Sequence, residues 1–247
     1  MIKGVILAGG NGTRLQPMTK VTNKHLLPLY DKPIIYYPIE KMVQAGVDRI
    51  MIVTSPHHLD DFVSLLGSGE NWRSKRTGKQ IQIVYGIQNE PRGIANALWI
   101  AKDYVGQDNC LLMLGDNVME DNLKPFIESF ATGAQIFLKK VSDPTRFGIA
   151  TLDSKGLVKK IVEKPKKPAS NWAVIGAYLY DNSVFDKMID LPPSVRGEYE
   201  ITEVNNKYLK QRALNATKLK GKWFDVGTFD SLLAGSLHYQ KKTKRSK

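Results

Sequence analysis

Short apolar runs alternate with amphipathic segments along the first half of the chain. The apolar runs are typical of buried strands and lie at residues 4–8, 49–54, 80–85 and 109–114. The segments between them repeat apolar residues every three or four positions, as helices do, and lie at residues 34–45, 59–66 and 94–104. This alternation predicts an α/β protein with a Rossmann-like, mainly parallel sheet that carries helices on both faces.

The second half of the chain has a different pattern, in which short strand-like runs predominate after residue 133. These runs are separated by turn residues and lie at 135–141, 148–152, 157–163 and 173–180. A helix with an acidic first turn is expected after Gly197, and a second helix is expected at 229–239. We therefore expect one domain over residues 1–240, with a β-rich part inserted in its second half.

The formal net charge of +12 is concentrated in part at the end of the chain. Residues 241–247 carry five of these charges, which leaves +7 for the rest, and we expect this basic tail to be disordered. The tail lacks the interleaved aromatic residues of nucleic-acid stacking surfaces, so no nucleic-acid partner is expected. With no membrane-length apolar run and no room for a signal peptide before the first strand, we expect a cytoplasmic protein without a membrane partner.

A glycine-rich loop follows the first predicted strand. Gly9, Gly10 and Gly12 lack a Cβ, so the backbone can adopt positive φ and bring successive N–H groups close to an anion. Arg14 and Lys24 add a forked guanidinium and a compact ammonium, both of which suit phosphate oxygens. Together these residues predict a site for a nucleoside triphosphate.

The spacing of this loop excludes the two commonest phosphate-binding motifs. A dinucleotide fingerprint starting at Gly10 requires a small residue at position 15, where the chain has Leu15. A Walker loop requires Lys followed by Ser or Thr after its last glycine, whereas Thr13 and Arg14 follow Gly12. From the loop alone, a plain glycine turn beside an unrelated arginine remains an alternative.

A second polar motif, Gly115-Asp116-Asn117, follows the predicted strand at 109–114. In parallel sheets, ligands bind beyond the carboxyl ends of the strands. The glycine loop also follows a strand, so both motifs are expected at one ligand-binding edge of the sheet.

Motifs dispersed along roughly residues 2–235 resemble those of the sugar-phosphate nucleotidylyltransferases. The early ones are Leu7-Ala-Gly-Gly-Asn-Gly-Thr-Arg-Leu-Gln-Pro17, Asn23-Lys-His-Leu-Leu-Pro28 and Tyr30-Asp-Lys-Pro-Ile-Ile-Tyr-Tyr-Pro38. The later ones are Leu114-Gly-Asp-Asn117, Arg146-Phe-Gly148, Glu163-Lys-Pro165, Arg196-Gly-Glu-Tyr-Glu-Ile-Thr202 and Trp223-Phe-Asp-Val-Gly-Thr228. Their order along the chain makes the resemblance specific.

Within this family the resemblance is nearest to enzymes that act on thymidine nucleotides. It implies dTTP and glucose 1-phosphate as substrates, Mg²⁺ as cofactor, and a homo-oligomer, either a tetramer or a dimer. It also implies that residues 1–133 bind the nucleotide and residues 134–240 the sugar phosphate. The attacking phosphate is already an anion at neutral pH, so no nucleophilic side chain or general base is expected.

The resemblance also implies roles for individual residues. Catalytic roles are expected for Arg14, Lys24 and Lys164. The residues expected to bind the nucleotide are Leu7, Gly9, Gly10, Gly12, Thr13, Gln88 and Gly93, with the last two next to the base. The residues expected to bind the sugar phosphate are Asn117, Gly148, Glu163, Lys164, Arg196 and Thr202. Asp116 and Asp225 are expected to share the Mg²⁺ ion.

Two alternatives stay open from the sequence. A uridylyl-, cytidylyl- or adenylyltransferase would use the same machinery, and a glutamine can pair with uracil as well as with thymine. A catalytically silent regulatory subunit should have lost charge from the site, whereas the charged residues named above are present. Ile175 stands where the family more often has a small polar residue, so the sugar preference is also open.

Overall fold

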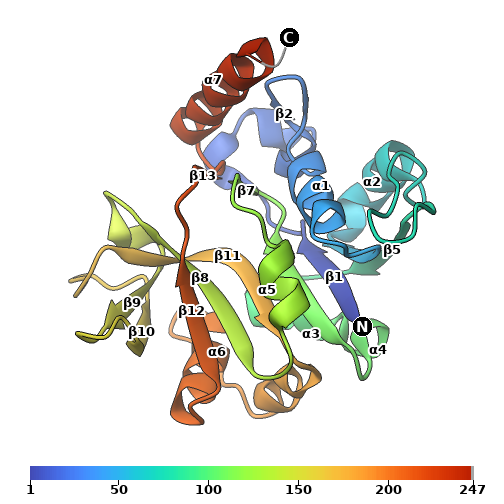
Figure 1. Cartoon of the computed structure of the whole chain (residues 1–247). Helices are drawn as coiled ribbons and strands as arrows, with labels where there is room; N and C mark the ends of the chain where they lie inside the picture. Colours follow the sequence, from blue (N-terminus) through green and yellow to red (C-terminus); the bar gives the residue numbers. More distant parts are fainter. Residues whose placement is uncertain (246–247) are drawn as a thin grey trace.

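The computed structural model describes residues 1–245 of the 247, and within this range a nine-stranded mixed sheet forms the centre of the molecule (Figure 1). The strand order is β10-β9-β11-β6-β1-β4-β5, and β8 joins the sheet beside β11 and β12. The parallel strands of the first half are β1 (Ile2–Leu7), β4 (Arg49–Thr54), β5 (Gln82–Ile87) and β6 (Asn109–Leu114). The predicted Rossmann-like α/β fold is confirmed.

The strands of the second half extend this sheet. They are β8 (Ala134–Lys140), β9 (Gly148–Leu152), β10 (Val158–Glu163), β11 (Trp172–Tyr180) and β12 (Leu214–Lys218). β11 is the link between the halves, because it pairs antiparallel with β8 along one side and, on the other side, with β6 at Ala177–Tyr180 and with β9 at Ala173. The β-rich second half is therefore continuous with the parallel part of the sheet.

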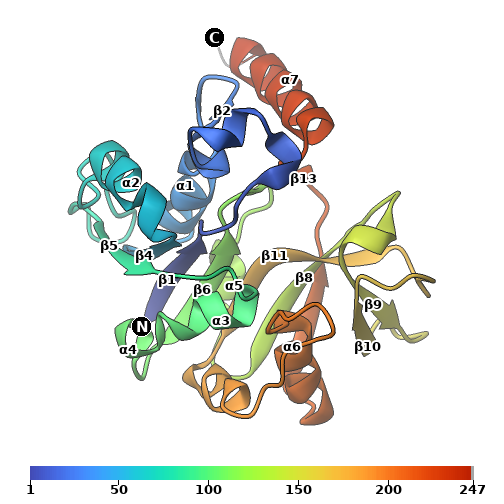
Figure 2. The ribbon, with the colours of Figure 1, turned by 180° about the vertical axis from the view of Figure 1, so that it is seen from behind.

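Helices cover both faces of the sheet, as Figures 1 and 2 show from opposite sides. One face carries α1 (Tyr36–Gln44), α2 (Leu59–Leu66) and α5 (Lys124–Ser129), and the other carries α3 (Ile94–Trp99), α4 (Lys102–Val105) and α6 (Ile201–Lys210). Successive residues of β1 alternate between the two cores, with Ile6 in one and Val5 and Leu7 in the other. Strands buried on both faces explain why the runs in the sequence are almost wholly apolar.

Two small two-stranded sheets lie outside the main one. β2 (Pro28–Leu29) pairs with β3 (Lys32–Pro33), and β7 (Asn117–Met119) pairs antiparallel with β13 (Trp223–Asp225). The second pair brings the end of the chain back to the carboxyl end of β6. No helix within residues 1–245 is long and apolar enough to cross a membrane.

Two expectations about helices are corrected. The segment 94–104 is broken, since α3 ends at Trp99 and α4 begins at Lys102. The basic tail is helical through residue 245, because α7 (Phe229–Arg245) continues past its predicted end, while residues 246–247 lie outside the described residues. Tertiary contacts hold α7 in place, including Tyr239 packed on Tyr37 at 4.6 Å between ring centroids and Lys242 Nζ donating to Glu120 at 3.0 Å. A charge run in sequence does not reveal such contacts.

Candidate active site

The glycine loop leaves β1 at the sheet edge where β6 also ends. The Nδ2 group of Asn23 donates to the carbonyl of Ala8 at 2.9 Å, which folds the loop back onto the strand end. The backbone N–H of Gly115 donates to the carbonyl of Leu7 at 2.9 Å. The loop and Asp116 are therefore neighbours, as expected for the ends of adjacent parallel strands.

Two adjoining cavities open at this edge and share Leu114, Asp116 and Lys164 among their walls. The first has a volume of about 260 Å³ and is lined by Leu7, Gly9, Gly10, Lys24, Gln88, Gly93 and Arg196, among others. The second has a volume of about 580 Å³ and is lined by Thr13, Arg14, Asn117, Gly148, Glu163, Thr202 and Asp225, among others. We call the two together the cleft. It gathers nearly all the residues that the sequence singled out.

Lys24 and Asp116 form an ion pair in the floor of the cleft. Lys24 begins a 3-10 turn, whose preceding residue, Asn23, accepts a hydrogen bond from the backbone N–H of His25 at 2.9 Å. Burial tends to raise the pKa of Asp116, but the Lys24 ammonium outweighs this and holds the pKa well below its usual range. Burial, followed by the Lys24 charge, lowers the pKa of His25 to about 3. His25 is therefore a neutral packing residue at physiological pH.

The small sheet β7–β13 brings Asp225 beside Asp116. Asp225 lies opposite Asn117, and the backbone N–H of Val226 donates to the carbonyl of Asp116 at 3.1 Å. Burial and the negative charge of Asp116 raise the pKa of Asp225. Arg146 Nη2 lies 3.1 Å from Oδ2 of Asp225 and partly balances its charge. Two aspartates far apart in sequence thus converge in the fold.

This pair fits the donor set of a hard divalent cation. Burial, followed by the charge of Asp116, raises the pKa of Asp225, and a bound cation would favour the ionised form of both carboxyls. Within the described part of the chain, no group of three or more His, Cys, Asp or Glu side chains is arranged to hold a metal. Two carboxylates alone are typical of Mg²⁺, which completes its octahedron with water and substrate phosphates.

Arg14 approaches Asp225 from the glycine loop. It lies in the 3-10 turn Thr13–Leu15, which follows Gly12. Gly12 has a φ of 61°, a left-handed conformation that favours glycine, so its role in the turn is conformational. A Cβ added to Gly227 would stand 2.8 Å from Nη2 of Arg14. The lack of a side chain at Gly227 therefore leaves the space in which the guanidinium lies.

Gln88 and Gly93 line the first cavity with the glycine loop. Gln88 is buried, and its Oε1 lies 2.9 Å from the place where a Cβ on Gly9 would stand. Gly93 has a φ of 100°, and a Cβ there would stand 2.6 Å from the carbonyl oxygen of Tyr199. Close packing within the protein therefore accounts for glycine at positions 9 and 93. This structural reason stands beside the expected approach of a ligand to these two residues.

Glu163, Thr202 and Gly148 meet in the second cavity. Glu163 Oε2 accepts a hydrogen bond from Thr202 Oγ1 at 2.6 Å, and a Cβ on Gly148 would crowd both groups. Burial, partly offset by that hydrogen bond, raises the pKa of Glu163. Arg196 Nη2 lies 3.6 Å from Glu163 and 2.7 Å from Glu200, so its guanidinium is held between carboxylates at the border of the two cavities.

Lys164 has an uncommon backbone conformation at the end of β10. Its φ is 40°, although it is not a glycine, and its backbone N–H donates to the carbonyl of Phe147 at 3.0 Å. Non-glycine residues in the left-handed region are held there by their surroundings and are often found at functional sites.

The structure also changes the interpretation of Asn117. Its Oδ1 accepts hydrogen bonds from the N–H of Gly176 at 2.9 Å and from Nε1 of Trp223 at 2.8 Å. Its Nδ2 donates to Oδ1 of Asp116 at 3.1 Å. Asn117 was expected to bind the sugar phosphate, and the structure gives it a further part in orienting Asp116.

Sequence reasoning missed three charged residues of the cleft, which are Arg146, Glu198 and Glu200. Of these, Arg146 contacts a residue of the expected metal pair. Arg146 lies in the motif Arg146-Phe-Gly148 and ends a 3-10 turn, which Asp143 caps by accepting from the backbone N–H of Thr145 at 3.2 Å. The cap and the motif were visible in the sequence. The partner, Asp225, was not, because the pair is separated by 79 positions.

The fold and the cleft define an α/β protein of the nucleotidyltransferase type, with a glycine loop and paired aspartates at the carboxyl edge of the sheet. A family model described as "Nucleotidyl transferase" matches residues 3–242, and the chain belongs to this family. Two relatives named glucose-1-phosphate thymidylyltransferase are similar over most of the chain. That of Mycolicibacterium smegmatis is 42% identical over 95% of this chain and 81% of its own, and that of Xanthomonas campestris is 44% identical over 93% and 78%.

Solved structures agree on the fold. A Bacillus anthracis protein classed as a glucose-1-phosphate thymidylyltransferase, solved with sucrose, has a TM-score of 0.88 and 44% identity, covering 96% of this chain and 94% of that one. A UDP-glucose pyrophosphorylase solved with UDP-glucose has a TM-score of 0.83 and 25% identity, covering 98% of this chain and 100% of that one.

Proposed function

We propose that this protein transfers a thymidylyl group from dTTP to glucose 1-phosphate, giving dTDP-glucose and pyrophosphate. The observation that carries the proposal is the identity of 42–44% to glucose-1-phosphate thymidylyltransferases over more than nine-tenths of the chain. The cleft supports it, because its walls combine a glycine loop, two aspartates and several cations at the sheet edge where such ligands bind.

The reaction is an in-line displacement at the α-phosphorus of the nucleotide. A bond forms from a phosphate oxygen of the sugar phosphate to the α-phosphorus, while the bond from that phosphorus to the oxygen bridging the α- and β-phosphates breaks. Pyrophosphate leaves with the electron pair of the broken bond. The nucleophile is an anion at neutral pH, so the protein has to position the phosphates and neutralise their charge.

In this proposal Arg14, Lys24 and Lys164 each bind a different phosphate group. Arg14 holds the triphosphate and stabilises the charge that develops on the leaving pyrophosphate, and Lys24 binds the α-phosphate. Lys164 orients the attacking phosphate, and Glu163 and Thr202 bind sugar hydroxyls. Asp116 and Asp225 would hold a Mg²⁺ ion, which supplies charge neutralisation at the phosphate oxygens when bound.

A second candidate is a uridylyltransferase with the same mechanism. The similarity to a UDP-glucose pyrophosphorylase over 98% of this chain favours it, and the Gln88 carboxamide can pair with uracil as well as with thymine. A silent regulatory subunit has less support, because the charged side chains of the cleft are present and line it.

The test is release of pyrophosphate from dTTP, UTP, CTP and ATP, each with glucose 1-phosphate and Mg²⁺, with and without a chelator. Chelator-sensitive release with the highest kcat/KM for dTTP is the expected result. A maximum for UTP would keep the mechanism and change the donor. Absence of release with every triphosphate and several sugar 1-phosphates would contradict the proposal.

The proposal includes self-association through α7. Phe229, Leu233 and Leu237 are 46%, 60% and 47% exposed and lie four residues apart, so they form one apolar stripe on the outer face of this helix. If two copies pack their α7 helices antiparallel with Leu233 against the partner's Leu237, Asp230 of each approaches Lys241 of the other. Such a self-complementary contact is what a two-fold interface requires.

Leu233→Glu should halve the mass measured by light scattering, because it places a charge in the apolar stripe. A monomeric unsubstituted protein would contradict self-association through α7.

A further inference from the structure

The carboxamide of Gln88 forms a hydrogen bond with a second carboxamide, that of Asn96. Gln88 is only 7% exposed, and its Nε2 donates to Oδ1 of Asn96 at 2.9 Å. Its Oε1 points to the other side, toward Gly9 of the glycine loop. One N–H of Gln88 is thus used within the protein, while Oε1 and the second N–H are left for a ligand in the first cavity.

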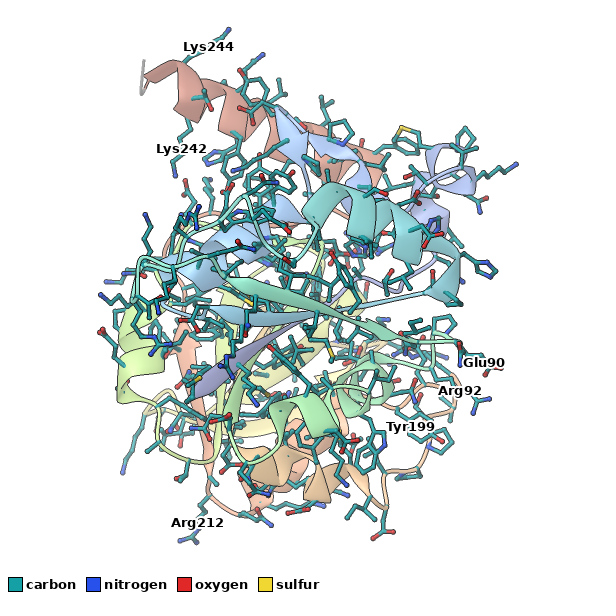
Figure 3. All side chains as sticks on the ribbon, turned by 90° about the vertical axis from the view of Figure 1, so that its right-hand side faces the viewer. Glu90, Arg92, Tyr199, Arg212, Lys242 and Lys244 are labelled. Carbon is teal, nitrogen blue, oxygen red and sulfur yellow. The ribbon has the colours of Figure 1, made fainter. Side chains whose placement is uncertain are left out.

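Asn96 comes from a well-anchored part of the fold. It is the third residue of α3, and the backbone N–H of the preceding Ala95 donates to the carbonyl of Tyr199 at 3.2 Å. The N–H of Tyr199 in turn donates to the carbonyl of Arg92 at 2.8 Å, and Figure 3 shows these two residues together on one side of the molecule. The backbone that carries Asn96 is therefore anchored beside Gln88.

A carboxamide that rotates by a half-turn exchanges the places of its oxygen acceptor and its NH₂ donor, so it can present either one to a given atom of a ligand. Thymine and uracil carry an N3–H donor beside a carbonyl oxygen, whereas cytosine carries an N3 acceptor beside an amino group. If Gln88 turns over while Asn96 keeps its orientation, Oε1 of Gln88 faces Oδ1 of Asn96, and two acceptors stand against each other without a proton. The contact with Asn96 therefore opposes the orientation that suits cytosine.

We infer that Asn96 is a positioning residue that fixes the hydrogen-bonding edge of Gln88 and so makes the site select 2,4-dioxopyrimidines, thymine or uracil, over cytosine. The inference rests on the proposed function, because it assumes that the base of a pyrimidine nucleotide lies against Gln88. It adds to that function a residue outside the wall of the first cavity.

The experiment compares kcat/KM for dTTP and dCTP in the unsubstituted protein and in Asn96→Ala, Asn96→Asp and Asn182→Ala. Asn96→Ala frees Gln88 to turn, so the ratio of kcat/KM for dTTP to kcat/KM for dCTP should fall about tenfold, mainly through KM. Aspartate offers only acceptors, so Asn96→Asp should keep the ratio within about threefold. Asn182, which pairs with Gln107 at the surface, is the matched asparagine control and should change nothing.

A merely structural role of Asn96 predicts an equal loss of kcat/KM for both nucleotides, which leaves their ratio unchanged. An unchanged ratio in Asn96→Ala would therefore overturn the inference. Calorimetric binding of dTTP and dCTP, without glucose 1-phosphate, decides the question even if no turnover is found. Absence of turnover in the unsubstituted protein would count against the proposed function. The ratio of the affinities for dTTP and dCTP in the variants would still test the role of Asn96.

Discussion

The ammonium group of Lys24 donates to Oδ2 of Asp116, joining two residues 92 positions apart in the chain. Both side chains are largely buried, with 14% and 8% of their surfaces exposed. In such surroundings the loss of one partner leaves an unbalanced charge with little solvation. The pair therefore matters for stability as well as for the proposed binding of phosphate.

Lys24→Met should destabilise the protein by about 3 kcal/mol at pH 7 in metal-free buffer, since it leaves Asp116 buried without its cation. The pKa of Asp116 is lowered in the folded state, so the stability it contributes is present above the unfolded pKa of about 3.9 and is lost as the pH falls below it. The difference between the proteins in denaturant unfolding should therefore shrink below about pH 4. Lys32→Met breaks a more exposed pair with Glu40 and should lose less than about 1 kcal/mol. Equal losses in the two variants would contradict the argument.

Arg146→Ala should lower kcat by about 10²-fold, the scale of losing one positioned electrostatic group in a site. The same change removes the cation beside Asp225, so the negative charge of Asp225 and Asp116 is less balanced and favours a bound divalent cation more strongly. The Mg²⁺ concentration for half-maximal rate should then fall, and Mn²⁺ binding followed by electron paramagnetic resonance should tighten without substrates. Arg146→Lys keeps the charge and should restore the metal affinity. Weaker metal binding in Arg146→Ala would instead mean that Arg146 mainly shapes the site.

The strands of the first half could be predicted because length, apolar character and flanking turns all agreed. β4 (Arg49–Thr54) and β6 (Asn109–Leu114) begin and end at the predicted residues. β7 (Asn117–Met119) was missed, since it has three residues and its pairing depends on β13, far along the chain. The length of α7 was underestimated for a similar reason, because tertiary contacts extend it.

The candidate site could be predicted where a residue type and a strand end coincide. Asp116 and the glycine loop follow parallel strands, so their proximity followed from topology. The partners of the polar and charged groups were beyond prediction. Nothing local indicates that Arg146 balances Asp225, because these residues are 79 positions apart and meet only when distant elements pack. Gln88 and Asn96 are only 8 positions apart, but their contact depends on the path of the loop between β5 and α3, which the sequence pattern does not fix.

Gly227→Ala should leave the fold intact and slow the reaction. The new Cβ would stand 2.8 Å from Nη2 of Arg14, so the tip of this flexible side chain would have to move from its place in the cleft. We expect a loss of kcat of about tenfold, smaller than the 10²–10³-fold loss expected for Arg14→Ala, because the guanidinium is displaced and not removed. In Arg14→Ala the added change Gly227→Ala should have no further effect on kcat. Additive losses in the double variant would show that Gly227 acts independently of Arg14.

Gly93→Ala should harm both stability and nucleotide binding, and Gly46→Ala is its matched control. The two glycines have similar positive φ values, 100° and 91°, so alanine is strained at both positions. A Cβ at Gly93 would also stand 2.6 Å from the carbonyl oxygen and 2.9 Å from the nitrogen of Tyr199, whereas a Cβ at Gly46 would meet nothing within 4 Å.

Gly46→Ala should therefore lose about 1 kcal/mol of stability with normal kcat/KM, as backbone strain alone predicts. Gly93→Ala should lose about 2 to 3 kcal/mol and raise the KM for dTTP at least tenfold, because the loop that carries Gln88 has to move away from Tyr199. Equal destabilisation of the two variants, measured by denaturant unfolding beside the kinetics, would mean that the contact with Tyr199 relaxes freely and that Gly93 serves only the turn.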